Sequence, residues 1–498
     1  EENTLVLIDG MRTINYPAPD GNGWASVDIN ASIPRIALAR TELLLDGGSA
    51  IYGTDAVAGV VNLIPDYDFR GVKLQYSTTR VTEAMGADDY SLGLLLGTGN
   101  DTTSAIAAFD WRRRDLLLET DSDGDEQLDP NLVGQDIGSF NFANFWDAGD
   151  VPIPRGGPAA VPQLDPLCGD TSAFPDQPPA YAGQIINSRG TDFCQGFSEI
   201  VPVYSRNPVD SFTAFAAIEH NFSDRLTGST NFTFSQTRLD RQWEFGGTVT
   251  PVLDGDGDPF TIITPATNPG VLYAESIDPG NWSDPDGYVS QNYQAVPYQQ
   301  ALPGFQEDQQ LRLAGSLDYE LNDDWNLGFD AIIGEGFAEV HRRYIVPGRM
   351  QSALDGLGGP ECAPGSTPGT GTCHYWNPFM SAGLANAETL GLANSLEVAD
   401  WIMPLDTRDF TNKLESYQLV LDGQLSGFEL GGGPVGVALG FEQRKDSFDA
   451  DFDPIMNQGG YNNQEGSPVP DYDGTINVDA LFGEIILPVT EDLLVQLA

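Results

Sequence analysis

The sequence predicts an all-β protein in which about ten or eleven strands form part of a transmembrane antiparallel β-barrel. Three observations predict this class. Strand-like segments come in pairs joined by very short turns, whereas long connections separate one pair from the next. Apolar and polar residues alternate within the strands, as they do when one face meets lipid and the other a wet interior. No apolar run reaches the roughly 18 residues that a membrane-spanning helix needs.

The turns and connections form two distinct classes. The short turns carry Gly, Asn, Asp or Pro, as tight hairpins require, and lie at 98–102, 221–225, 321–325, 431–434 and 489–492. The long connections cover roughly 119–207, 246–306, 347–409 and 453–473. A soluble β-sandwich also alternates along its strands, but it has no reason to separate short turns from long loops. The segregation therefore favours the barrel.

The two-residue period is clearest in segment 311–321. Its apolar positions are Leu311, Leu313, Leu317, Tyr319 and Leu321, and its polar positions are Arg312, Ser316, Asp318 and Glu320. Because successive side chains of a strand point to opposite faces, these two sets lie on opposite sides of the sheet. We expect the apolar set to face lipid and the polar set to face the interior.

Composition limits the possible partners. The chain has 73 Asp and Glu against 23 Lys and Arg, for a net charge of −50. This excess excludes a nucleic-acid-binding protein, which needs clustered basic residues to neutralise phosphates. Composition does not decide whether the acidic residues keep the protein soluble or bind cations. The 56 Gly and 34 Pro residues suit many turns and long irregular loops.

The four cysteines fall into two close pairs, Cys168 with Cys194 and Cys362 with Cys373. Each pair lies in a Pro/Gly-rich stretch without further metal ligands at a suitable spacing. Two local disulfides and an oxidising compartment are the favoured interpretation, and reduced structural thiols are the alternative.

Residues 4–65 carry a long and specific match. They begin TLVLIDGMR at 4–12, continue through the Ile33–Pro34 segment and 43–46, and end in GGSAIYGTDAVAGVVN at 47–62. This segment closely resembles the second half of the plug domain of TonB-dependent outer-membrane receptors. In physical terms, we expect Gly47 and Gly48 to end a buried strand in a tight turn, and 57–64 to form another buried strand.

The resemblance implies a domain division and a mechanism. Residues 1–66 would be the C-terminal half of the plug, and 67–498 the N-terminal portion of a barrel of about 22 strands. Both ends of that protein would be missing, and Glu1 is preceded by no signal peptide. The family captures a ligand outside the outer membrane of a Gram-negative bacterium. An inner-membrane TonB energy-transducing complex then drives uptake, without a cofactor and without enzymatic chemistry.

One candidate binding segment lies between Arg12 and Val27, which in the family forms a plug apex loop facing the ligand. Its candidate contacts are Tyr16, Asp20, Asn22 and Trp24. The aromatic rings are suited to stacking and the polar side chains to hydrogen bonding. An ordinary Pro/Gly loop with exposed aromatics is the alternative.

A second candidate is a basic collar at the outer ends of ascending strands. It comprises Arg80, Arg112, Arg113, Arg114, Arg238, Arg241, Arg342, Arg343, Arg444 and Lys445. Arginine suits bidentate contacts with lipopolysaccharide phosphates. Intramolecular pairing with nearby Asp and Glu explains the collar equally well.

Metal binding and catalysis have little support. Asp121, Asp123 and Asp125 have the spacing of a calcium loop but lack its Gly and terminal Glu, so a solvated acidic turn is favoured over weak calcium binding. The repeat at 254–258 fails in the same way. The three histidines are scattered, and no nucleophile or phosphate-loop motif occurs. We therefore predict no catalytic residues.

Two other functions compete with active uptake. A passive outer-membrane porin or adhesin shares the barrel but does not explain residues 4–65. A secreted β-rich glycan-binding protein explains acidity, aromatics and disulfides, but not the segregated loops. The ligand of an uptake receptor is open among siderophore, cofactor, glycan and apolar molecule; the aromatic apex and acidic loops lean slightly towards a neutral glycan.

Overall fold

The fold is that of a computed structural model, which describes most of the chain. The described residues are 4–18, 26–45, 56, 58–80, 88–118, 144–147, 163–175, 184–188, 191–195, 204–242, 247–249, 252–253, 259–260, 262–290, 292–294, 303–460 and 469–497. Structural statements below refer to these residues.

One large antiparallel sheet contains 11 strands. In spatial order they are β5 (Gly71–Thr79), β6 (Asp89–Gly99), β7 (Thr103–Arg114), β14 (Val209–Ser223), β15 (Leu226–Gln242), β21 (Pro303–Asn322), β22 (Trp325–Arg343), β23 (Leu405–Leu430), β24 (Gly433–Phe452), β25 (Tyr472–Thr490) and β26 (Leu493–Leu497). The spatial order follows the chain, as in a meander. The predicted all-β class and the predicted strand count are confirmed.

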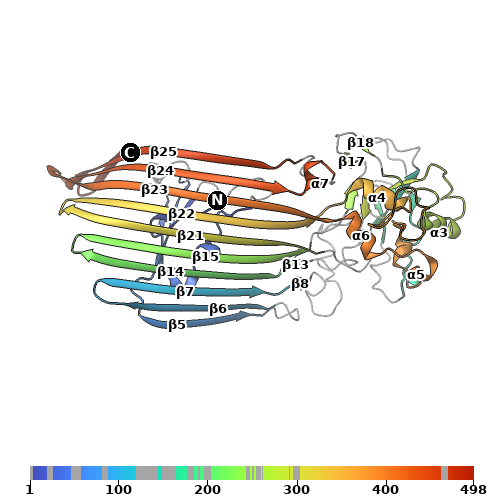
Figure 1. Cartoon of the computed structure of the whole chain (residues 1–498), viewed down its shortest axis with the longest axis horizontal. Coiled ribbons are helices and arrows are strands. Elements are labelled where there is room, and N and C mark those ends of the chain that lie inside the picture. Colours follow the sequence, from blue (N-terminus) through green and yellow to red (C-terminus); the bar gives the residue numbers. More distant parts are fainter. Residues whose placement is uncertain are drawn as a thin grey trace.

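The predicted segregation of loops is visible in Figure 1. The short turns gather at one end of the large sheet, and the long connections gather at the other. Tight hairpins join β6 to β7, β14 to β15 and β21 to β22, with two or three residues outside the strands in each case. The short turns predicted from their Gly, Asn, Asp and Pro residues are therefore the turns of these hairpins.

The two faces of the large sheet have the predicted polarity. Leu311 and Leu313 are each 46% exposed, whereas Arg312 between them is only 3% exposed. On β15, Phe232 is exposed while Asn231 and Thr233 are buried. The exposed face is thus apolar and the buried face polar, as in a strand between lipid and a plugged lumen.

A small sheet lies against the polar face of the large one (Figure 1). It has the order β2-β1-β4-β3, with strands β1 (Thr4–Ile8), β2 (Met11–Arg12), β3 (Leu38–Leu44) and β4 (Gly59–Pro65). Between β2 and β3 lie α1 (Ile29–Ser32) and the 3-10 turn η1 (Arg35–Ala37). Ile33 and Ile36 pack on Leu95, Ile106 and Phe215 of the large sheet.

The expectation of a buried strand before Gly47 is wrong. β3 is an edge strand of the small sheet, and Leu43 is 65% exposed. No described element covers its outer side, so its apolar side chains remain accessible. The strand expected at 57–64 is present as β4, which is largely buried between β1 and β3.

The long connections are more ordered than the irregular loops expected from Gly and Pro content. They contain α3 (Pro269–Ile277), α4 (Pro347–Leu354), η7 (Met380–Gly383), α5 (Ala387–Leu390) and α6 (Leu396–Ile402). We define the cap as residues 163–175, 262–290 and 345–403. Two clusters of buried side chains hold it together, one around Trp282 and Phe379 and the other around Trp376 and Ile402.

Short elements complete the described structure. They are β8 (Leu117–Leu118), β9 (Asn144–Asp147), β10 (Gln163–Leu164), η4 (Thr171–Ala173), β11 (Gln184–Ser188), β12 (Thr191–Gln195), β13 (Tyr204–Arg206), β16 (Gly247–Val249), β17 (Val252–Leu253), β18 (Pro259–Phe260), β19 (Tyr288–Ser290), β20 (Asn292–Gln294) and α7 (Pro454–Asn457). No helix in the described part of the chain is both long and apolar enough to cross a bilayer.

Candidate functional site

A strap formed by residues 11–16 runs from β2 along the inner face of the large sheet. Its first anchor is on the small sheet, where both the amide and the hydroxyl of Thr13 donate to the carbonyl of Val6, at 3.2 and 3.0 Å. Further along, Asn412 Nδ2 donates to the Asn15 carbonyl at 2.7 Å. Ile14 packs into the space left by Gly334, where a Cβ would lie 2.3 Å from its Cγ2.

Arg312 fastens the start of the strap to β21. Its Nε donates to the Arg12 carbonyl at 2.8 Å, and its Nη2 to the Met11 carbonyl at 3.2 Å. Nη1 donates to Asn231 of β15. A guanidinium presents its donors in a rigid planar fork, whereas the three donors of an ammonium rotate on a flexible stem. The buried charge therefore joins three segments that are distant in sequence.

An ion cluster holds the other side of β2. Arg12 Nε lies 3.4 Å from Glu442 Oε1, and both side chains are 9% exposed. Glu442 also lies 3.8 Å from Arg444, which pairs with Asp446 at 3.3 Å. Breaking such a buried pair is costly because it leaves a charge without compensation.

Two cavities adjoin the outer end of the strap. The larger has a volume of about 960 Å³ and lies between the strap and β23, β24 and β25. The smaller, of about 680 Å³, lies towards β6, β7 and β14. Tyr16, Ser26 and Val27 line both. Each cavity is large enough for a small-molecule ligand, and Tyr16 stands where they meet.

Arginines dominate the smaller cavity. Arg35 of η1 and Arg112 and Arg114 of β7 line it, and within the described residues none of the three makes an ion pair. Arg206 also lines it but pairs with Asp89 at 3.3 Å. The guanidinium groups of these three arginines are donors of the kind that bind anionic oxygens.

The carboxylates of this cavity are mostly engaged elsewhere. Asp28 caps α1 by accepting from the amides of Asn30 and Ala31. Asp308 accepts hydrogen bonds from Tyr16 and Gln306. Asp110 interacts electrostatically with Arg112 and Arg35. The lining as a whole carries five arginines and four aspartates, a small excess of positive charge.

The larger cavity is partly aromatic. Phe448 and Tyr472 line it, with ring centroids 5.8 Å apart. Phe410 and Phe452 extend the ring cluster along the same face, at 6.2 Å from Phe448 and 6.0 Å from Tyr472 respectively. Offset rings at these separations give a surface on which a flat apolar group can stack.

No model of a known protein family matches the chain. Among solved structures, it is similar to a mutant of the ferric enterobactin receptor PfeA from Pseudomonas aeruginosa, with 12% identity, coverage of 99% of this chain and 49% of that chain, and a TM-score of 0.46. The siderophore receptor PirA from Acinetobacter baumannii gives 13% identity, 98% and 47% coverage, and a TM-score of 0.44. The ferric-catecholate import receptor Fiu from E. coli K12 gives 10% identity, coverage of 98% of this chain and 60% of that chain, and a TM-score of 0.41.

The chain spans 49%, 47% and 60% of the three receptors named above.

Of the predicted apex residues, Tyr16 lines both cavities. Asp20, Asn22 and Trp24 lie outside the described residues. Sequence reasoning missed Arg35 as a cavity residue and Arg312 as an anchor. Arg312 had a signal, because it is a basic residue on the polar face of an alternating strand. Arg35 had none beyond its place after the matched Ile33–Pro34 segment.

The predicted collar is divided by the pleat of the strands. Arg112 and Arg114 lie on the same face as buried Ile106 and Ala108, so they point inward. By the same alternation Arg113 and Arg238 lie on the opposite face, and Arg113 also borders the smaller cavity. Other members lie elsewhere: Arg342 and Arg343 end β22, Arg80 follows β5, and Arg444 and Lys445 lie in the middle of β24 rather than at its end. The side chain of Arg241 lies outside the described residues.

The outward arginines of the rim are paired within the chain. Arg113 lies 3.2 Å from Asp115, and Arg238 lies 2.9 Å from both Asp240 and Glu307. Arg80 and Arg343 similarly lie 3.6 and 2.5 Å from Asp88 and Asp400. These contacts favour intramolecular pairing over lipopolysaccharide binding.

We therefore expect the charge reversal Arg113→Glu to leave lipopolysaccharide retention within about two-fold of wild type, because exposed pairs of this kind contribute only about 0–1 kcal/mol. Lipid phosphate that co-purifies with detergent-extracted protein measures this, and Arg225→Glu at a short turn is the matched control. A several-fold loss confined to Arg113→Glu would restore the lipid interpretation.

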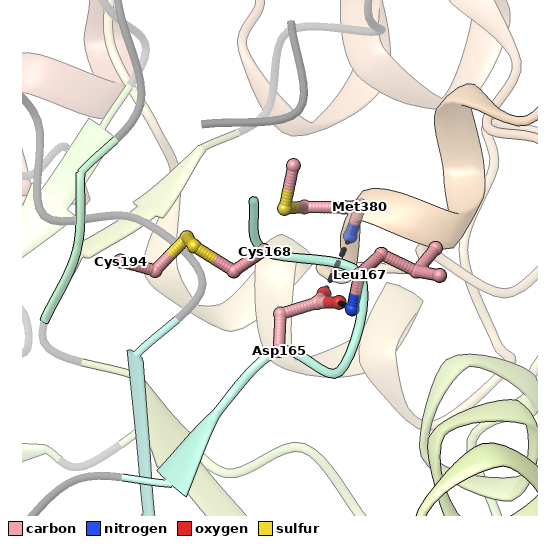
Figure 2. The surroundings of a disulfide bond; sticks show 5 residues. All are labelled: Asp165, Leu167, Cys168, Cys194 and Met380. Carbon is pink, nitrogen blue, oxygen red and sulfur yellow. Dashed lines mark hydrogen bonds between the residues drawn. A yellow bond between two sulfur atoms is a disulfide. The ribbon is translucent and has the colours of Figure 1, made fainter. Parts of the chain in front are cut away.

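Both cysteine pairs form disulfides in the cap region, Cys168–Cys194 and Cys362–Cys373. Figure 2 shows the first together with Asp165, whose side chain points towards the backbone of Leu167 and Met380. Asp165 is 2% exposed and accepts from these two amides at 2.9 and 2.8 Å. Burial raises its pKa to about 6. It thus connects the first and third long connections.

The acidic segments considered for calcium binding are not among the described residues. Asp121, Asp123 and Asp125 lie outside the described part of the chain, as does 254–258. Within the described residues, no group of three or more His, Cys, Asp or Glu side chains is placed to hold a metal ion.

Proposed function

We propose that this chain is part of a TonB-dependent receptor in the outer membrane of a Gram-negative bacterium, and that it takes up a multiply charged anionic ligand. The single observation that carries the choice of ligand is the cavity lined by Arg35, Arg112 and Arg114. In a chain of net charge −50, three arginines without ion pairs at one place concentrate positive potential where a ligand enters.

The arrangement of the two sheets supports the uptake mechanism. We infer that residues 1–66 act as the second half of a plug and 67–498 as barrel and outer connections. Arg312 and Glu442 hold the first plug strands to the barrel wall. A plug held by a few directional contacts can be displaced when force is applied, so an inner-membrane TonB complex is the partner we propose.

The cavity supports an anionic ligand over the neutral glycan, towards which the sequence leans only slightly. Arginine forks bind carboxylate, phosphate and phenolate oxygens through paired, charge-assisted hydrogen bonds. The aromatic wall at Phe448 and Tyr472 lies in the adjoining cavity and suits the flat parts of such a ligand. The chemistry of a metal-bound polyphenolate combines both features. The name of Fiu refers to ferric catecholates.

A ferric tris-catechol complex is a suitable anionic probe. We expect the full chain in detergent to bind it, and Arg112→Glu to weaken binding at least ten-fold, because reversal removes a charge-assisted contact and adds repulsion. Tryptophan fluorescence quenching at fixed ionic strength measures affinity. Arg225→Glu, at an exposed turn on the opposite end of the sheet, makes the same charge change and should bind as wild type does.

A neutral maltooligosaccharide tests the competing ligand class. It should bind neither the wild type nor Arg112→Glu measurably. If the oligosaccharide bound while the ferric complex did not, or if Arg112→Glu and Arg225→Glu weakened binding equally, the anionic-ligand proposal would be wrong.

A further inference from the structure

Tyr16 has an unusual position at the end of the strap. It lines both cavities, and its backbone amide donates to the Ser26 carbonyl at 2.6 Å. Its hydroxyl donates to Asp308 and accepts from the amide nitrogen of Gln306. Those two partners are 5% and 4% exposed on the inner face of β21. A group that enters either cavity therefore meets a side chain that is bonded to the barrel wall.

The contacts of the strap are arranged in series from Tyr16 to β1. Asn15 is held by Asn412, Ile14 packs in the Gly334 space, and Thr13 bonds to Val6 of β1. Because these contacts lie on consecutive residues, they form one continuous path between Tyr16 and β1. The path ends at β1, whose parallel pairing with β4 forms the centre of the small sheet.

We propose that Tyr16 is a positioning residue that couples ligand occupancy of the two cavities to the β1–β2 hairpin, by giving up its hydroxyl contacts with Asp308 and Gln306. The inference rests on the proposed function and deepens it. A ligand that favours the released strap must pull Tyr16 from the wall, and by linkage the release and the binding strengthen each other by the same factor.

The substitution Tyr16→Phe removes only the hydroxyl group. The ring, the charge and nearly all of the volume remain. Gln306 Nε2 donates to Asp308 Oδ1 at 3.1 Å, so these two side chains still have a hydrogen-bond partner when the hydroxyl is removed. Gln306→Leu removes one partner from the other side, again without a change of charge. Tyr319→Phe, on the exposed lipid-facing side of the same strand, is the matched control.

The first measurement is hydrogen–deuterium exchange of residues 4–16 in the full chain without a probe. Loss of a hydrogen bond to a charged group should speed exchange about ten-fold or more in Tyr16→Phe and Gln306→Leu, and leave Tyr319→Phe unchanged. If exchange in Tyr16→Phe matches wild type, the coupling is refuted whether or not a ligand is known.

The second measurement separates coupling from simple stabilisation. The ferric tris-catechol complex should speed exchange of 4–16 in wild type but add little in Tyr16→Phe, where the strap is already released. Its affinity should rise about three- to ten-fold in Tyr16→Phe, because binding no longer breaks the hydroxyl contacts.

The outcomes distinguish this inference from the proposed function. A probe that fails to bind wild type refutes the anionic-ligand proposal, while the exchange data without probe still decide whether Tyr16 restrains the hairpin. A probe that binds all variants alike, with the same effect on residues 4–16, upholds ligand binding and refutes the coupling.

Discussion

Arg312→Met is expected to free the β1–β2 hairpin from the barrel wall. The carbonyls of Met11 and Arg12 and the amide oxygen of Asn231 would each lose a buried donor. Each such loss costs about 1–3 kcal/mol, partly offset because a charge is no longer buried, so we expect a net cost of about 2–4 kcal/mol. Hydrogen exchange of residues 4–16 measures this local free energy.

Two further variants sharpen the result. Arg312→Lys keeps the charge but lacks the planar fork, so it should recover only part of the loss. Arg225→Met, at an exposed turn, should leave exchange unchanged. If the methionine variant kept wild-type protection, the anchor would have to lie in the Arg12–Glu442 pair instead.

The second large effect is a pH dependence of the cap. The pKa of Asp165 is about 6 in the fold against an ordinary value of 3.8. Above pH 6 the carboxyl is ionised in both folded and unfolded states. As pH falls from 6 to about 3.8, the folded state takes up a proton first, so the cap gains roughly 3 kcal/mol. This stabilisation is complete below 3.8 and is lost as pH rises through 6.

Exchange of residues 163–175 and 379–392, corrected for intrinsic rates, measures the dependence. Asp165→Asn cannot ionise, and its amide can accept from only one of the two backbone amides. It should therefore be less stable than wild type at pH 4, and its cap should show a much flatter profile between pH 4 and 6. Burial also raises the pKa of Asp355, which leaves a smaller slope of the same sign. An unchanged slope in Asp165→Asn would assign the effect to other groups.

The barrel strands could be predicted because their signal is local. The alternation at 311–321 and the turn residues at 321–325 specify a hairpin and its two faces without knowledge of the rest of the chain. The cysteine pairs were also accessible, since each is close in sequence. The cap was not, because its clusters join side chains from separate connections, such as Trp282 with Phe379.

The candidate site divides in the same way. By itself, the sequence determined the strand faces and the family resemblance of residues 4–65, and it offered Tyr16 as a candidate ligand contact. The tertiary structure decided which distant groups meet: Arg35 with Arg112, Arg312 with the Arg12 carbonyl 300 residues away, and Asp165 with Met380 across 215 residues. Period and turn chemistry act between neighbours, whereas a cavity or a buried charge is satisfied by whichever residues the fold brings within hydrogen-bonding distance.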